Sequence, residues 1–374
     1  MNDTTLKSIA KSLVPENYLA LANDARAEHL VRRKHYNFSH GIGRSGNLTD
    51  AQPKAAGSTI MSNLTNSLVC DLIRSVGIPN CTKAIIIPLA TGMTMMLALR
   101  AIHSKRPTSC YVLWSRVDQQ SCFKSISAAG LTPISSYFSH QLNQGARTGR
   151  IDAFIQSTDK NLLVPVGGAI VGGFTTDTVD AIAQLYPGRA SGTQSLDVLM
   201  TLLSLGKKGY ESLMQEQKEA HKMLLDGLTH LAQTHGEHIL PCRNPISIAM
   251  SLVSFQGNSS GRLEMIGSML QKRGVSGCRV VTTTESKTID GNTFLRWGSH
   301  SSNASVPYLT ASAALGIKPQ EIAQHLNDTS YNHRPSLSAI KVFSVIKKLS
   351  SYHTSAAATN YERPGVVTAR PCTM

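Results

Sequence analysis

Residues 84–94 have the sequence AIIIPLATGMT and decide the fold. The apolar run at residues 84–89 is typical of a buried strand, and Ala90-Thr91-Gly92-Met93-Thr94 leads from it into a helical pattern at residues 95–102. A second unit of this kind pairs a strand at residues 110–114 with a helix at residues 119–129. Strands that alternate with helices predict an α/β domain with a mainly parallel sheet.

Outward from this stretch, the apolar spacing predicts a helix at residues 59–76 that Gly77 ends. Residues 151–156 and 162–174 are expected to form a hairpin with a glycine turn. Helices at residues 196–205 and 210–234 lead to strands at residues 245–255 and 275–284 of a second, smaller α/β domain. We expect four parts: an N-terminal segment with a phosphate-binding loop (1–58), a large domain truncated between about 134 and 143 (59–195), linking helices with the small domain (196–330), and a flexible tail (331–374).

The composition describes a soluble globular chain with a strong excess of positive charge. The chain has 374 residues, of which 41% are hydrophobic and 16% charged, and a mean hydropathy of -0.10. These values exclude a disordered chain, and no apolar run is long enough to span a membrane. The net charge of +14 favours polyanionic partners such as RNA, or phosphorylated substrates.

The seven cysteines are odd in number, scattered, and contain no C-x-x-C pair. They therefore indicate neither a disulfide framework nor a zinc ribbon, and no metal site is expected. Residues 1–13 have no apolar core of a signal peptide and no Arg-rich presequence, so we expect a cytoplasmic protein.

A glycine loop, Gly41-Ile42-Gly43-Arg44-Ser45-Gly46, matches G-x-G-x-x-G but follows a basic, polar run rather than a buried strand. A dinucleotide fingerprint needs that strand, so this interpretation is disfavoured. Arg44, Ser45 and the glycine-exposed amides could instead hold a phosphate. A solvated basic loop is the alternative.

Two strand ends suggest a cofactor. Ala90, Thr91 and Gly92 lie where a strand passes into a helix, which offers free backbone amides to a phosphate, although an ordinary turn has the same pattern. Lys160 follows another strand end, where it is either a surface residue or an amine in a low-dielectric pocket that reacts with an aldehyde. The two together suggest pyridoxal phosphate.

Longer motifs resemble O-phosphoseryl-tRNA(Sec) selenium transferase, the selenocysteinyl-tRNA synthase of eukaryotes and archaea. The resemblance covers residues 36–316 and rests on the segments at 41–46, 52–58, 88–93, 118–125, 144–154, 159–161, 164–170, 186–191 and 275–281. It implies a homotetrameric fold-type-I pyridoxal-phosphate enzyme that converts phosphoseryl-tRNA(Sec) to selenocysteinyl-tRNA(Sec) with selenophosphate.

The resemblance also implies roles for single residues. Lys160 is similar to the Schiff-base lysine, and Gln119 to the residue that lies against the cofactor ring. Arg44, Ser45, Gln52 and Arg189 resemble the set that holds the substrate phosphate, and Arg147 and Arg279 match positions of tRNA contact. In this chemistry a freed Lys160 removes the α-proton, the cofactor takes up the charge, and arginines stabilise the departing phosphate.

The chain also departs from the family. Between residues 134 and 144 it has only a short link, where the family carries several strands and helices with an Asn-Asn-Ala-Tyr segment at the cofactor's pyridine; a Gly-Glu-Arg-Glu-Gly-Arg segment is missing before Arg33, and Gln120 replaces a lysine. Three functions follow as alternatives: an active selenium transferase, an impaired member that keeps tRNA or subunit binding, and a general pyridoxal-phosphate lyase. The missing segment leads us to expect little or no selenium transferase turnover.

Overall fold

The computed structural model describes residues 44–135, 150–242, 244–255, 263, 265–272, 278–301 and 304–317. Some of the residues named above lie outside this part: residues 41–43 of the glycine loop, Arg147, and the expected tail at residues 331–374. The chain divides into two units, formed by residues 1–221, 281–306 and 313–318 and by residues 222–280, 307–312 and 319–374. Each unit is described by itself. In the described part, no helix is both long and apolar enough to cross a membrane.

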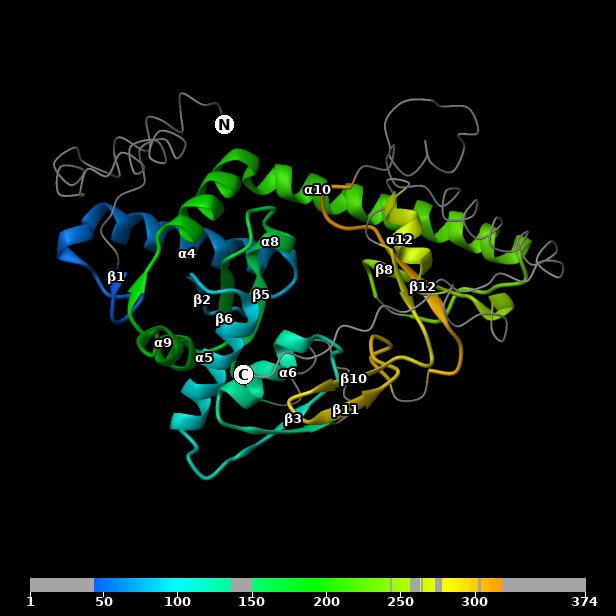
Figure 1. Ribbon diagram of the computed structural model, residues 1–374. Helices are drawn as coiled ribbons and strands as arrows, with labels where there is room; N and C mark the ends of the chain where they lie inside the picture. The colour runs from blue at the N-terminus through cyan, green and yellow to red at the C-terminus, as the bar shows by residue number, and fades with distance from the viewer. Residues whose placement is uncertain are drawn as a thin grey trace, which may run out of the picture. The chain divides into compact units, whose positions relative to one another are not determined.

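The centre of the first unit is a three-stranded sheet in the order β2 (Lys83–Ile87), β6 (Ala169–Gly173), β5 (Phe154–Ser157) (Figure 1). β6 pairs antiparallel with both neighbours, so β2 and β5 run in the same direction on either side of it. The expectation of a mainly parallel sheet is therefore wrong for these strand pairs, because the expected hairpin returns β6 between the other two strands. The connection from β5 to β6 contains the short helix α8 (Thr158–Asn161).

Helices cover both faces of this sheet, which explains why β2 is apolar throughout. Ile85 and Ile87 point to the face covered by α5 (Thr91–Ser104) and α9 (Thr176–Gln184). Ala84 and Ile86 point to the opposite face and share a core with residues of α4 (Ala56–Val76) and α10 (Thr193–Thr234). The alternation along the strand thus divides its side chains between two cores.

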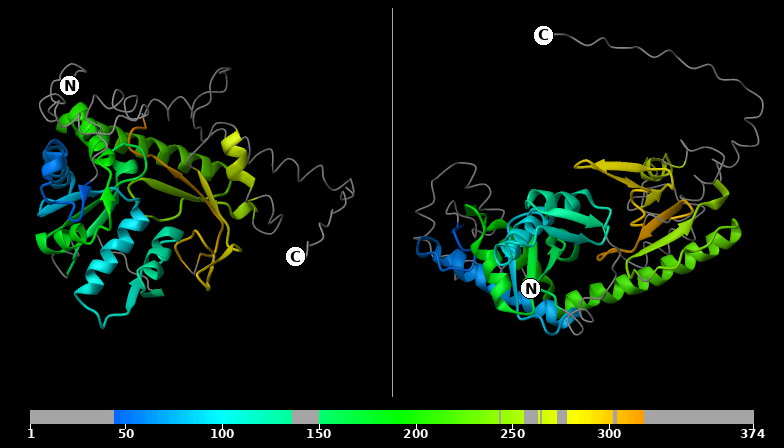
Figure 2. Two further views of the ribbon diagram at one scale, coloured as in Figure 1. Left: turned by 60° about the vertical axis from the view of Figure 1, so that its left-hand side comes forward. Right: turned by 90° about the horizontal axis from the view of Figure 1, so that it is seen from below.

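A second, smaller layer of this unit contains the remaining predicted strand-and-helix pair. β3 (Tyr111–Trp114) pairs parallel with β4 (Thr132–Ser135), and α6 (Gln120–Ala128) packs on them. Trp114 and Phe123 have ring centroids 5.0 Å apart and share their core with the hairpin β10 (Ser286–Ile289) and β11 (Asn292–Leu295). Figure 2 shows this hairpin beside α6.

Sequence patterns place most of the helices correctly. α4 ends at Gly77, which has a φ of 145°, as expected. The two expected helices at residues 196–205 and 210–234 form α10, whose helical geometry is broken at Gly206 (φ 61°, ψ 179°). The expected strand at residues 151–156 begins later, at Phe154.

The second unit contains a sheet in the order β8 (Ser247–Ser251), β12 (Tyr308–Ser312), β9 (Arg279–Val281), with α12 (Met265–Lys272). Its core includes Met250, Ile266 and Leu309. Beyond β8 lies the 3-10 helix η2 (Val253–Phe255), whose first amides donate to the buried carboxylate of Glu237. The strands expected at residues 245–255 and 275–284 are thus present in shorter form.

Candidate active site

The strand register brings the two predicted cofactor-binding segments to one edge of the sheet. Ile87 of β2 and Ser157 of β5 are both partners of Ala169 on β6, and the two outer strands run in the same direction. Ala90 lies three residues after Ile87, and Lys160 lies three residues after Ser157. The carboxyl ends of strands that run in one direction form one edge, so both segments leave the sheet there.

The first turn of α5 offers backbone amides at this edge. Ala90 is the N-cap and makes no side-chain capping bond, and the first turn holds no acidic residue. The buried Thr94 fixes the turn, because its hydroxyl donates to Leu89 O at 3.1 Å. A helix start of this kind suits an anion, since its amides and its dipole both favour negative charge.

Gln119 lies next to this turn. It is the exposed N-cap of α6, and its side chain does not cap that helix. A Cβ added to Gly92 would lie 3.0 Å from Ser121 Cβ, so the starts of α5 and α6 are in close contact. A larger residue at position 92 would push the two helix starts apart.

Lys160 lies on α8 in a small polar cluster. Its Nζ is 3.3 Å from Asp159 Oδ2 and 3.4 Å from Ser157 Oγ, and the Ser157 hydroxyl donates to the Asp159 carboxylate. The hydrogen bond from Ser157, with help from the Lys160 charge, holds the pKa of Asp159 below its ordinary value. The Lys160 side chain is 72% exposed. Within the described residues, no low-dielectric pocket surrounds this amine, and its exposure corresponds to the surface alternative.

The backbone around Lys160 is well fixed. Tyr210 of α10 donates its hydroxyl proton to Asn161 O at 2.7 Å, and the hydroxyl of Thr158 donates to Gly168 O at 2.9 Å. Leu163, just beyond α8, has a φ of 56°, an uncommon value for a leucine. These contacts hold the main chain around the lysine, whereas its side chain is held by the local contacts with Asp159 and Ser157.

The predicted phosphate-binding residues gather elsewhere in the same unit. β1 (Arg44–Ser45) pairs antiparallel with β7 (Arg189–Ala190), with Ser45 opposite Arg189. Gln52 is the N-cap of the 3-10 helix η1 (Pro53–Ala55). Leu48 and Ala190 pack in the core that contains α9, and Figure 1 shows β1 beside α9 and apart from α8. Strand pairing thus joins the Arg44–Ser45 segment to Arg189, away from the α8 helix that carries Lys160.

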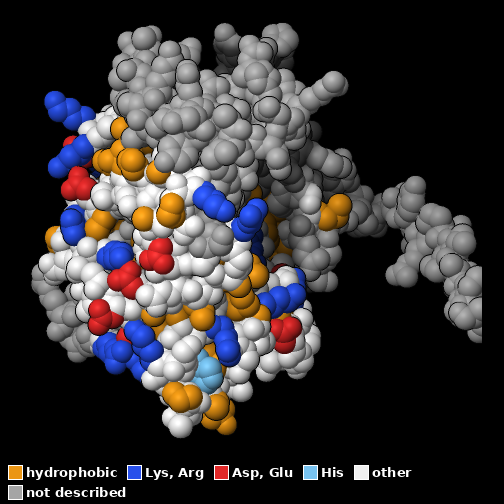
Figure 3. Space-filling model, turned by 90° about the vertical axis from the view of Figure 1, so that its left-hand side faces the viewer, with side chains coloured by type: hydrophobic (Ala, Val, Ile, Leu, Met, Phe, Trp, Pro, Cys, Tyr) orange, Lys and Arg blue, Asp and Glu red, His pale blue; other side chains and the backbone are white. Residues whose placement is uncertain are grey.

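The predicted tRNA-contacting residues can be described only in part. Arg279 is an exposed residue on β9 of the second unit, and its carbonyl accepts from the Thr310 hydroxyl at 3.3 Å. Arg147 lies outside the described residues. On the face of the molecule in Figure 3, Lys and Arg side chains are scattered among Asp and Glu side chains.

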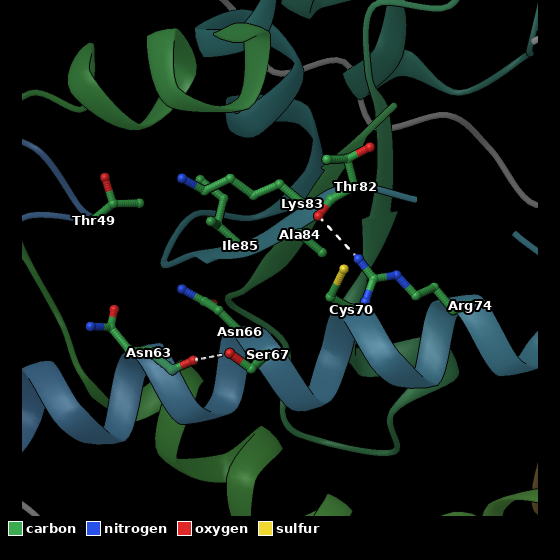
Figure 4. Close-up of a pocket in the computed structure, with 10 residues that line it drawn as sticks. All are labelled: Thr49, Asn63, Asn66, Ser67, Cys70, Arg74, Thr82, Lys83, Ala84 and Ile85. Carbon is green, nitrogen blue, oxygen red and sulfur yellow. Dashed lines mark hydrogen bonds between the residues drawn. The ribbon is translucent and has the colours of Figure 1, made fainter. Parts of the chain in front are cut away.

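A polar cavity of about 360 Å³ lies between α4 and the outer side of β2 (Figure 4). Asn66 closes one part of it by accepting the amide of Ile86 at 2.9 Å, and Arg74 donates to Cys81 O at 2.7 Å. None of the predicted site residues lines this cavity; its residues are Thr49, Asn63, Asn66, Ser67, Cys70, Arg74, Thr82, Lys83, Ala84 and Ile85. We assign it no part in the candidate site.

The sequence analysis missed a buried charge cluster beside Gln119. Asp118, the preceding residue, is buried, and its carboxylate accepts hydrogen bonds from Arg116 Nε at 3.2 Å and from the amides of Gly298 and His300. The sequence does contain one indication of this cluster: two opposite charges, Arg116 and Asp118, stand immediately before the expected helix. Its partners at residues 295–300 lie too far along the chain for any pattern to reveal.

Comparison with known structures identifies the fold. An archaeal O-phosphoseryl-tRNA(Sec) selenium transferase structure superposes with a TM-score of 0.71, at 24% identity, over 87% of this chain and 89% of that one. A rice TDC structure with PLP and tryptamine has a TM-score of 0.51 at 10% identity, over 91% of this chain and 83% of that one. The fold is that of the fold-type-I pyridoxal-phosphate enzymes.

A family model, O-phosphoseryl-tRNA(Sec) selenium transferase (SepSecS), matches residues 22–135 and 132–331. A Dictyostelium discoideum protein of this name is 36% identical over 385 residues, covering 78% of this chain and 80% of its own length. One from Caenorhabditis elegans is 32% identical over 367 residues, covering 79% and 76%. The chain belongs to the O-phosphoseryl-tRNA(Sec) selenium transferase family.

The same comparisons show an internal gap. The two parts of the family match meet at residues 132–135, which form β4. The alignment with the Dictyostelium protein is 385 positions long but includes 78% of this chain, or about 292 residues. Roughly 93 positions of the alignment are therefore gaps in this chain. These positions of the relative thus have no counterpart in this chain, and the two parts of the family match meet in β4.

Proposed function

We propose that this chain binds pyridoxal phosphate at Lys160 and acts on phosphoseryl-tRNA(Sec), with selenophosphate as the selenium donor. The observation that carries the proposal is the shared sheet edge. Lys160 and the first turn of α5 both follow strands that end at this edge, and Gln119 joins them through the contact between the starts of α5 and α6. Family membership supplies the reaction, and the positive charge of the chain suits a tRNA.

The residues at this edge fit the cofactor. The uncapped amides of residues 91 and 92 suit its phosphate, Gln119 suits a face of its ring, and the Lys160 amine suits its aldehyde. The contact of Gly92 with Ser121 leaves no room for a side chain that would fill this corner. When bound, the cofactor supplies an electron sink for the carbon that loses its α-proton.

Lys160 has two tasks in this proposal. Its Nζ must first leave Asp159, because an ammonium paired with a carboxylate is no nucleophile. Once the substrate has displaced it, the free amine accepts the α-proton of the phosphoseryl group. The exposed position of the side chain permits both movements.

Arg44, Ser45, Gln52 and Arg189 would hold the phosphate that leaves the substrate, since guanidinium groups stabilise the charge that develops on it. The β1–β7 pair packs with α9, and Figure 1 shows it apart from α8. We therefore propose that a homo-oligomer, a tetramer as in the resemblance, completes the site by bringing the β1–β7 pair of one copy to Lys160 of another. The cytoplasm, where charged tRNA is used, is the proposed compartment.

The proposed role of Lys160 is tested by adding pyridoxal phosphate to the purified full chain and reducing it with borohydride. We expect a reducible absorbance band and a label on Lys160 that is lost in Lys160→Ala. Lys207→Ala, at another exposed lysine, is the matched control. A label elsewhere that persists in Lys160→Ala would contradict the proposal.

Binding of tRNA is proposed for Arg147, Arg279 and the basic surface. We expect the affinity for tRNA(Sec) to fall steeply between about 50 and 200 mM salt, as counterion release requires. Arg279→Ala should reduce that salt slope by about one unit. An affinity that does not depend on salt would argue against this interface.

A second candidate function is binding without turnover. The observation that favours it is the separation of β3 and β4 from the sheet that carries Lys160, at the point where the family match is interrupted. A general lyase for small amino acids is not favoured, because the Dictyostelium and Caenorhabditis relatives are both named O-phosphoseryl-tRNA(Sec) selenium transferase.

A further inference from the structure

A buried carboxylate joins two segments that lie far apart in the sequence of the first unit. The Asp118 side chain has no solvent exposure, and its Oδ2 accepts the amides of Gly298 and His300 at 2.8 Å each. The amide of Asp118 donates to His300 Nδ1 at 3.0 Å. Side chain and main chain of one residue therefore hold the turn at residues 298–300.

Arg116 closes the cluster from the other side. Its Nε donates to Asp118 Oδ1 at 3.2 Å, and its Nη2 donates to Leu295 O. The Arg116 side chain is buried with the carboxylate. The charges are thus paired, and both carboxylate oxygens accept hydrogen bonds: Oδ1 from the Arg116 side chain and Oδ2 from two backbone amides.

The backbone in this cluster is strained. Arg116, Arg296 and His300 have φ angles of 35°, 55° and 55°, in a region that residues other than glycine rarely adopt. Such conformations persist only where the surroundings hold them, and they are concentrated at functional sites. The hydrogen bonds of Asp118 and Arg116 supply that restraint.

The restrained segment ends at Gln119. This residue directly follows Asp118, caps the start of α6 without using its side chain, and is exposed. The contact of Gly92 with Ser121 places it next to the first turn of α5. A shift of Asp118 would therefore move Gln119 relative to the amides of residues 91 and 92.

We propose that Asp118 is a positioning residue: its buried carboxylate, fixed by Arg116 and the 298–300 turn, aims Gln119 at the cofactor that the first turn of α5 holds. This inference rests on the proposed function. It gives a reason for the buried ion pair of Arg116 and Asp118. Burying an ion pair is costly compared with apolar packing, and a turn with no positioning role would not need one.

The test compares Asp118→Asn with Glu237→Gln in the full chain. Glu237 is the matched control, since its buried carboxylate also accepts two backbone amides, of Val253 and Ser254, but lies in the second unit. The readouts are the dissociation constant for pyridoxal phosphate, from the borohydride-reducible band, and hydrogen exchange of the amides at residues 119–123.

We expect Asp118→Asn to weaken cofactor binding about tenfold, the effect of one lost charged hydrogen bond, and to speed exchange at residues 119–123. Glu237→Gln should change neither. Unchanged cofactor affinity in folded Asp118→Asn, or an equal loss in both variants, would overturn the inference. Should Asp118→Asn fail to fold, His300→Ala removes the imidazole with its Nδ1 acceptor, keeps the Asp118 carboxylate, and should weaken binding about threefold; no change in that variant would overturn it as well.

Failure of the proposed function gives a different result. In that case the unaltered chain shows no reducible band. Hydrogen exchange alone then tests whether Asp118 fixes the start of α6. Faster exchange at residues 119–123 in Asp118→Asn supports the positioning role, and unchanged exchange contradicts it.

Discussion

The thiols of Cys70 on α4 and Cys81 before β2 lie 3.9 Å apart. Both side chains are buried, and neither forms a disulfide. Burial, together with the neighbouring Cys70, raises the pKa of Cys81 from 9.0 to about 11. Of the free cysteines in the described part, Cys110 and Cys242 are exposed and offer a direct comparison within the same chain.

We expect Cys81 to resist alkylation by iodoacetamide at pH 8 while Cys110 and Cys242 react. The raised pKa lowers the thiolate fraction of Cys81 about a hundredfold, since two pKa units separate it from an ordinary thiol. Mass spectrometry of the digested protein measures the labels, and urea-unfolded protein is the control in which all three react. Equal labelling of the folded chain at pH 8 would contradict this prediction.

The same pKa shift has a consequence for stability. A thiol whose pKa is higher in the folded than in the unfolded state stabilises the fold fully below about pH 9, and this contribution declines as the pH rises towards 11. The decline should be smaller in Cys81→Ala, in which that group does not titrate.

Among the elements, the pairing of β5 with β6 depends on a glycine. Phe154 is the register partner of Gly172, and a Cβ at position 172 would lie 2.3 Å from Phe154 Cζ. The ring therefore lies across the strand at a place where only hydrogen fits. This pair lies at the start of β5, the strand whose other end leads to Lys160.

We expect Gly172→Ala to destabilise the first unit by about 1–3 kcal/mol, the usual cost of overpacking a core. Gly267→Ala is the control, because nothing lies within 4 Å of a Cβ there and α12 should gain up to about 1 kcal/mol of helix stability. Urea unfolding measures both variants. A neutral Gly172→Ala would mean that Phe154 can leave its place without cost.

The two-stranded sheet of β3 and β4 leaves one apolar face to solvent. Tyr111, Leu113 and Ile134 are exposed on this face, whereas Val112 and Trp114 pack on α6. Short sheets with apolar faces and open edges favour association between chains. The two parts of the family match meet in β4, at the edge of this face.

We expect Leu113→Lys to reduce self-association of the purified chain, measured by light scattering, without lowering its stability by more than about 0.5 kcal/mol. Ile60→Lys is the control, since Ile60 on α4 is 53% exposed and Leu113 is 63% exposed. An equal effect of the two variants would show that general surface charge, and not this face, controls association.

Local patterns predicted these elements well, and their long-range partners poorly. The apolar run of β2 and the spacing in α4 and α5 could be identified because strand and helix periods are local properties. The position of β6 between β2 and β5 could not, because pairing direction depends on residues more than 80 positions apart. The same limit applies to the site: Lys160 and Ala90 were found from strand ends, but the link from Asp118 to His300 and the separation of Arg189 from Lys160 required the structure.

For the whole molecule, the central question is whether the parts of the site can act together. The chain keeps Lys160, Gln119, Arg44 and Arg189, yet within the described residues β3 and β4 form a sheet of their own. In the family, the resemblance implies further strands between them and the segment before β5, with residues at the cofactor's pyridine. A sheet that loses interior strands loses both the ladder partners of its neighbours and their support.

We therefore predict that this chain has little or no selenium transferase turnover, although it belongs to a family of active enzymes. Positioned chemistry loses about a hundredfold in rate for a misplacement near 1 Å, and here the Lys160 amine is exposed and still paired with Asp159. The assay is the formation of selenocysteinyl-tRNA(Sec) from phosphoseryl-tRNA(Sec) and selenophosphate. It is run beside a chain in which the corresponding segment of the Dictyostelium protein is inserted after Ser135, and Lys160→Ala of each chain gives the background. A rate in the unaltered chain comparable to that of the restored one would contradict the prediction, because it would show that a neighbouring copy or a rearranged strand does the work of the missing segment.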